Sequence, residues 1–193
     1  MLRRRFLTTV PFWISAGACA AGAGDDPRFP TSIASTIGGK STRLFLTGSA
    51  LRKKYGFSVY TVASYLQEGA RVNGAGGLAK ADLAKQLHLI FERDVDGQSI
   101  ATSFRGSIEA NHPAPAFGPE LARMEQYFVA HGAKQGDRVM LTHIPGVGLG
   151  CQFAGKSGVS IENVRFAHAI WDTYLGPNNL GVAIKEGLTS RLR

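Results

Sequence analysis

Cysteine is scarce in this chain, because only two of its 193 residues are cysteines. Cys19 lies at the end of a short N-terminal apolar stretch, and Cys151 lies among glycine and aromatic residues that favour a strand. If the N-terminal stretch is removed, Cys151 has no partner, and an internal disulfide is excluded. We therefore expect Cys151 to be a small buried hydrophobic residue.

Several site signatures are also missing. The net charge is +8, but the basic residues form no stripe on a helix and do not alternate with aromatic residues, so no nucleic-acid partner is expected. The five histidines have no neighbours at metal-ligand spacing, so no metal site is expected. A phosphate-binding loop that ends at Ser41 would need glycine at position 34, where this chain has Ala34, so no such loop is expected. Gly146, Gly148 and Gly150 lie between strands rather than before a helix, so no cofactor is expected.

Residues 1–24 are predicted to be a secretory signal peptide. Three arginines, Arg3 to Arg5, precede an apolar stretch from Phe6 to Ala18 that is too short to span a bilayer, and small residues follow it. The order R-R-x-F-L also fits a twin-arginine signal, and an ordinary signal remains the alternative. Lipidation of Cys19 is a weaker alternative. The expected location is periplasmic or secreted, with no stable membrane insertion after the signal is removed.

The remaining residues are enough for one buried domain, which we place at 41–193 after a proline-bearing lead-in at 25–40. Periodicity predicts strands, then two helices, then a hairpin, then further helices. Hairpin-linked strands followed by helix pairs indicate an α+β fold with an antiparallel sheet that carries helices on one face. The expected strands are 43–53, 57–66, 87–91, 137–143 and 148–153. The expected helices are 78–85, 97–111, 119–131, a helix capped by Ser160 and a short C-terminal helix.

Arg52 stands where a buried strand would favour an apolar side chain. Counting in twos from Leu44 places Arg52 on the same face as Leu46, Gly48 and Ala50. A guanidinium on such a face is costly unless it is paired or meets an anion. Two interpretations remain open: an ion pair with an acid such as Glu92 or Asp94, or an anionic ligand.

A series of motifs runs through the chain from about residue 41 to its end. It begins with G-x-x-x-R and V-Y-x-x-x-x-Y-L, from Gly48 to Leu66, and continues with F-E-R-D-V at 91–95, G-D at 136–137, P-G at 145–146, I-W at 170–171 and L-G-P at 175–177. In this order and spacing the motifs resemble the bacterial branch of the chalcone isomerase-like family.

The resemblance implies an open-faced β-sandwich, in which a long antiparallel sheet is covered by helices and a ligand cleft lies between them. Plant members are intramolecular lyases that close a chalcone into a flavanone, while related members hold fatty acids without such activity. The family's cleft arginine falls on Arg52, and a carbonyl-polarising hydroxyl falls near Tyr60. The helix tyrosine of the plant enzymes falls on Phe104, and their asparagine on Asn111. We expect Trp171 and Tyr174 to belong to the core, with a position of Trp171 at the cleft floor as an alternative.

The residue type at position 104 indicates which of these two activities to expect. Developing enolate charge needs positioned donors, and the loss of one donor typically costs about 10²–10³ in rate. A phenyl ring donates nothing, so efficient isomerase activity is not expected. Arg52 and Tyr60 at the end of an apolar cleft suit a carboxylate, so the expected ligand is a small amphipathic carboxylate such as a fatty acid. The alternatives are an isomerase acting on an enone, with Arg52 and Tyr60 as its catalytic residues, and a non-catalytic partner protein in a cell-envelope complex.

This interpretation requires Arg52 and Tyr60 to share one face of the hairpin. A three-residue loop from Lys54 to Gly56 would pair Arg52 with Ser58 and place Tyr60 diagonally on the same face. A two-residue loop of Tyr55 and Gly56 would put the two side chains on opposite faces. We therefore predict the three-residue loop, with Gly56 in the left-handed conformation.

Overall fold

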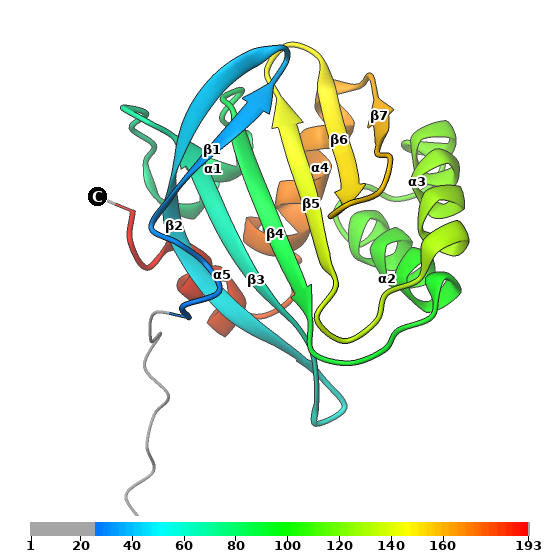
Figure 1. Ribbon diagram of the computed structural model, residues 1–193. Helices are drawn as coiled ribbons and strands as arrows, with labels where there is room; N and C mark the ends of the chain where they lie inside the picture. Colours follow the sequence, from blue (N-terminus) through cyan, green and yellow to red (C-terminus); the bar gives the residue numbers. More distant parts are fainter. Residues whose placement is uncertain (1–25, 193) are drawn as a thin grey trace, which may run out of the picture.

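The computed structural model describes residues 26–192. It contains one curled antiparallel sheet, in which the strands pair in chain order from β1 to β7 (Figure 1). The strands are β1 (Ser32–Ile37), β2 (Lys40–Lys54), β3 (Phe57–Gln67), β4 (Lys85–Phe91), β5 (Arg138–Ile144), β6 (Gly148–Phe153) and β7 (Val159–Ile161). The helices are α1 (Gly74–Lys80), α2 (Gly97–Glu109), α3 (Gly118–His131), α4 (Val164–Leu175) and α5 (Val182–Thr189). The α+β prediction is confirmed.

The two faces of the sheet bury different sets of side chains. Along β3, Val62 and Leu66 point to the helices and join the main core, which includes Ile170 of α4. Ala63 and Tyr65, which alternate with them, belong to a smaller apolar cluster on the opposite face. This alternation positions the functional site, because residues on the Val62 side of β3 face the space between sheet and helices.

The domain begins earlier than the predicted boundary at residue 41. Residues 25–40 were expected to be a lead-in, but residues 32–37 form β1, which pairs with β2 along its whole length. Phe29 before it is only 3 % exposed and packs on the opposite face of the sheet. Arg28 links the same segment to the residue that follows β4, because its Nη2 donates to Glu92 Oε1 at 2.7 Å. The predicted signal peptide at 1–24 lies outside the described residues.

Two helix boundaries differ from those expected. Ser160 lies in β7, and α4 begins after Asn163, whose Oδ1 accepts from the Phe166 amide at 3.1 Å. The first helix begins and ends earlier than residues 78–85, so Lys85 opens β4 and is fully buried. Its Nζ donates to the carbonyl oxygens of Leu78 and Ala79, and these bonds satisfy groups left free at the end of α1.

None of the helices within residues 26–192 is both long and apolar enough to cross a membrane.

Candidate functional site

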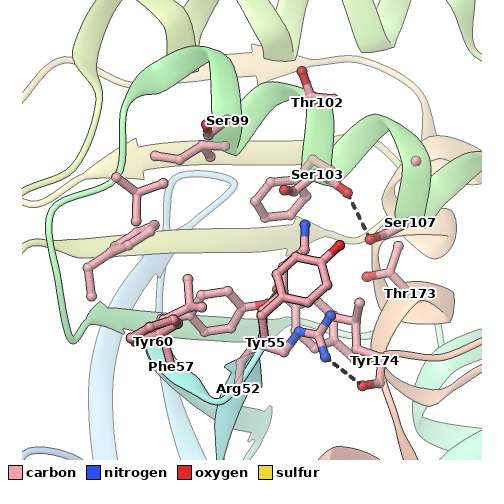
Figure 2. Close-up of a pocket in the computed structure, with 18 of the residues that line it drawn as sticks. Arg52, Tyr55, Phe57, Tyr60, Ser99, Thr102, Ser103, Ser107, Thr173 and Tyr174 are labelled. Carbon is pink, nitrogen blue, oxygen red and sulfur yellow. Dashed lines mark hydrogen bonds between the residues drawn. The ribbon is translucent and has the colours of Figure 1, made fainter.

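A cleft of about 820 Å³ opens between the β2–β3 hairpin, α2 and the segment that follows α4. Its volume is in the range of small-molecule sites in proteins. Much of its wall is apolar and comes from Val59, Phe91, Val95, Ile100, Phe104 and Leu180. Arg52, Tyr60 and Tyr174 lie close together on one side of this space, as Figure 2 shows.

A β-bulge turns Arg52 toward the cleft. The pairing of β2 with β3 shifts between Leu46 and Gly48, so Thr47 is the extra residue. Leu46 therefore packs on the face opposite the helices, whereas Ala50 packs on the helical face. The predicted common face for Leu44, Leu46 and Arg52 is wrong for this reason. Arg52 shares its face with Gly48 and Ala50 instead.

A second bulge brings Tyr60 beside Arg52. The hairpin has a two-residue turn, Tyr55 and Gly56, both with positive φ, so the predicted three-residue loop is wrong. In a regular hairpin this turn would place Arg52 and Tyr60 on opposite faces of the sheet. Val59 is an extra residue in β3, however, and it reverses the alternation of the faces. As a result Arg52 pairs directly with Tyr60, and both lie on the helical face.

Arg52 has no acidic partner among residues 26–192, so the ion-pair interpretation fails. Glu92 is bound by Arg28, and Asp94 by Lys134 at 3.0 Å. Arg52 instead donates from Nη1 to the Leu180 carbonyl at 3.1 Å (Figure 2). A guanidinium carries several further N–H donors in a planar fork. These donors remain for an anion in the cleft.

Tyr174, predicted to be a core residue, also lines the cleft. It is fully buried from solvent, yet it lines the cleft, and its hydroxyl lies 3.4 Å from that of Tyr60. Burial raises the pKa of both phenols, against a smaller opposing effect of the Arg52 charge. Both phenols therefore keep their protons at neutral pH and can donate to a ligand oxygen. The helical spacing of apolar residues along α4 predicts which side chains are buried, but it does not show which buried side chains line a cleft.

Phe104 lines the cleft, and its ring stacks on that of Phe128 with centroids 5.0 Å apart. Asn111 does not line the cleft. Its Nδ2 donates to the Asn178 carbonyl at 3.0 Å, and its Oδ1 accepts from the Asn178 amide at the same distance. Asn111 therefore fixes the segment after α4, which supplies Leu180 to the wall, and a direct ligand contact is not supported.

Three groups of metal-ligand type lie together, although no such site was expected. One ligand atom from each of Asp82, His143 and His168 lies within 4.8 Å of the others. Hydrogen bonds join these side chains to their neighbours, although Nδ1 of His143 has no hydrogen-bond partner. Nε2 of the buried His143 donates to Asp82 Oδ1 at 2.7 Å, Asp82 also accepts from the Gly146 amide, and His168 Nδ1 donates to the Ala79 carbonyl. We interpret the cluster as a structural tie between the β5–β6 turn, α1 and α4.

The family follows from a comparison with known sequences. A family model described as chalcone isomerase-like matches residues 29–189. The chain belongs to the chalcone isomerase-like family. Among solved structures, a fatty-acid binding protein of Arabidopsis thaliana has the same fold, with a TM-score of 0.63 and 17% sequence identity. That match covers 84% of this chain and 93% of the plant protein. No curated protein sequence matches the chain.

Proposed function

We propose that this chalcone isomerase-like protein binds a small amphipathic carboxylate, such as a fatty acid, without chemical conversion. The observation that carries the proposal is Arg52, a guanidinium that lines a largely apolar cleft and forms no salt bridge within residues 26–192. The two acids of the cleft lining are bonded elsewhere, Asp94 to Lys134 and Asp96 to the Ser99 amide. Charge-assisted bidentate bonds to a carboxylate suit this geometry. The fatty-acid binding protein with the same fold supports the choice of ligand class.

The ligand would lie with its head group at Arg52 and its tail along the apolar wall. The hydroxyls of Tyr60 and Tyr174, which stay protonated, would donate to the carboxylate beside the guanidinium. Phe104 and Ile100 of α2 would contact the tail. The arginine-rich start and apolar stretch of residues 1–24 support action outside the cytoplasm, either in the periplasm or after secretion.

The test compares a long-chain fatty acid with its methyl ester in the wild type and in Arg52→Gln, by displacement of a fluorescent fatty acid. Hydrogen bonds to charged groups contribute about 1.5–3 kcal/mol, so the acid should bind roughly 10- to 100-fold more weakly to Arg52→Gln. The ester, which carries no charge, should lose much less. The matched control is Arg93→Gln, because Arg93 also lines the cleft but is exposed to solvent, whereas Arg52 is half-buried.

Equal weakening of acid and ester would show that Arg52 supports the shape of the cleft and does not anchor a carboxylate. Equal effects of Arg52→Gln and Arg93→Gln would show a general charge effect. Either result would refute the proposal.

An intramolecular isomerase acting on an enone is the second candidate. The observation in its favour is Tyr174, because its hydroxyl and that of Tyr60 form a pair of donors where enolate charge would develop. Phe104, which offers no donor, weighs against it. Loss of chalcone absorbance that requires both Arg52 and Tyr60, with Tyr60→Phe as the variant, would support the enzyme. Absence of any turnover above the uncatalysed rate would exclude this substrate.

A further inference from the structure

The tip of the β2–β3 hairpin presents large apolar side chains to solvent. The hairpin extends beyond the end of the sheet (Figure 1). At its tip Tyr55 is 89% exposed and Phe57 is 64% exposed. Tyr55 also has φ 52°, a left-handed turn position that usually takes glycine, asparagine or aspartate. Two exposed aromatic rings, one of them at a backbone position unfavourable for a bulky residue, need an explanation beyond folding.

Basic side chains surround these rings. Lys53 and Lys54 precede the turn, and Lys54 Nζ lies 5.6 Å from the centre of the Tyr55 ring. Arg93, from the segment after β4, lies at the same distance from the Phe57 ring. These three cations take part in none of the salt bridges found in residues 26–192. The nearby acids of the cleft lining, Asp94 and Asp96, are bonded to Lys134 and to the Ser99 amide. The tip therefore combines exposed aromatic area with cations that form no salt bridge.

The same residues form the mouth of the cleft. Lys54, Tyr55, Phe57 and Arg93 all belong to its lining, and Arg52 lies on the same hairpin (Figure 2). A long-chain carboxylate is poorly soluble and is found mainly in bilayers. Such a ligand would cross this surface on its way from a bilayer to Arg52. The aromatic and basic side chains of the surface are those that suit a membrane interface.

We propose that this hairpin tip docks on the surface of an anionic lipid bilayer, with Tyr55 and Phe57 at the level of the head groups and the three cations against lipid phosphates. The carboxylate then passes between bilayer and cleft without crossing water. The passage of ligand rests on the proposed function, whereas the docking itself does not. Each cation near an anionic surface contributes about 1 kcal/mol, which is roughly fivefold in binding, so the three together contribute on the order of 100-fold.

The first test is sedimentation of the full chain with ligand-free vesicles of phosphatidylcholine, with and without phosphatidylglycerol. Binding should require the anionic lipid and should weaken strongly when the salt concentration is raised about tenfold, because the Debye length shortens. The double variant Tyr55→Ser/Phe57→Ser should bind at least about tenfold more weakly. Its control is Val129→Ser/Val182→Ser, which removes exposed apolar side chains from α3 and α5 and should keep wild-type binding.

The charges are tested in the same way. Lys53→Gln/Lys54→Gln should lose about 25-fold in binding to the anionic vesicles. Lys40→Gln/Lys80→Gln, which removes two exposed lysines elsewhere, should change binding far less. All variants share residues 1–25, so any contribution of that segment is common to them.

Binding that is equal for neutral and anionic vesicles, or that is unaffected by the tip variants, would overturn the proposal. Wild-type protein that stays in the supernatant would also overturn it and would leave a protein partner as the occupant of the tip. The two proposals fail separately, since vesicle binding is measured without carboxylate, and carboxylate affinity is measured without vesicles.

Discussion

His88 should make the fold sensitive to acid, and the structure explains why. The side chain is buried on the face of the sheet opposite the helices, against the ring of Tyr65. Arg138 Nη1 donates to His88 Nδ1 at 3.2 Å, so this nitrogen is an acceptor. Nε2 therefore carries the proton and donates to Gln86 Oε1 at 3.0 Å. A second proton on Nδ1 would break the bond to Arg138 and place two positive charges together.

The magnitude follows from the pKa. Burial, and then the charge of Arg138, lower the pKa of His88 to about 4 from its usual 6.5. Because the folded pKa is below the unfolded one, the unfolded chain binds more protons between pH 6.5 and pH 4. The free energy of unfolding is therefore highest above pH 6.5 and falls as the pH approaches 4. A pKa difference of about 2.5 corresponds to a loss of roughly 3 kcal/mol over this window.

The assay is urea unfolding, followed by circular dichroism at a series of pH values from 7 to 4. His88→Gln keeps an acceptor for Arg138 but does not titrate, so its free energy of unfolding should fall less with acid, by roughly 3 kcal/mol. A decline remains, because burial also lowers the pKa of His143 to about 4. Tyr65→Phe disturbs the same cluster without removing a group that titrates in this window, and it should keep the wild-type decline. An unchanged decline in His88→Gln would refute this reasoning.

Two further predictions concern packing. A Cβ on Gly48, which has φ +147°, would lie 2.0 Å from the Gly187 carbonyl oxygen, so Gly48→Ala should push α5 away from β2. The variant should lose at least about 2 kcal/mol in the free energy of unfolding measured with urea, and it should bind carboxylate more weakly because the Leu180 carbonyl that Arg52 contacts is displaced. Wild-type stability and affinity would contradict this. Cys151 is 1% exposed, and burial raises the pKa of its thiol, so it should react with a thiol reagent only after unfolding; rapid labelling of the native protein would show that β6 opens.

Much of the fold could be predicted from local patterns. Ile100, Phe104 and Ile108 recur at i, i+4 and i+8, which is why a helix was predicted at 97–111, and α2 covers Gly97–Glu109. Asp96 caps it, with its side chain accepting from the Ser99 amide. The short strand β7 was missed because its three residues have too few alternations to show a period. The strand β1 was missed because alternating serine, alanine and threonine give little hydrophobic contrast.

The site could be predicted only in part. Arg52 and Tyr60 follow from the family resemblance, and they do share a face, but not for the predicted reason. The bulges at Thr47 and Val59 each add one residue, and no turn signal or hydrophobic pattern marks either of them. Tyr174 was assigned to the core because its spacing on α4 matches the buried stripe, and it is in fact both buried and part of the cleft wall.

The most direct measurement is native mass spectrometry of the protein purified from its own cells, followed by denaturing release of any bound small molecule. We predict a stoichiometric lipid carboxylic acid in the wild type and its loss from Arg52→Gln, because the cleft anchors the head group through that guanidinium. An empty wild-type protein, or a bound molecule without a carboxylate that Arg52→Gln retains, would contradict the proposed function.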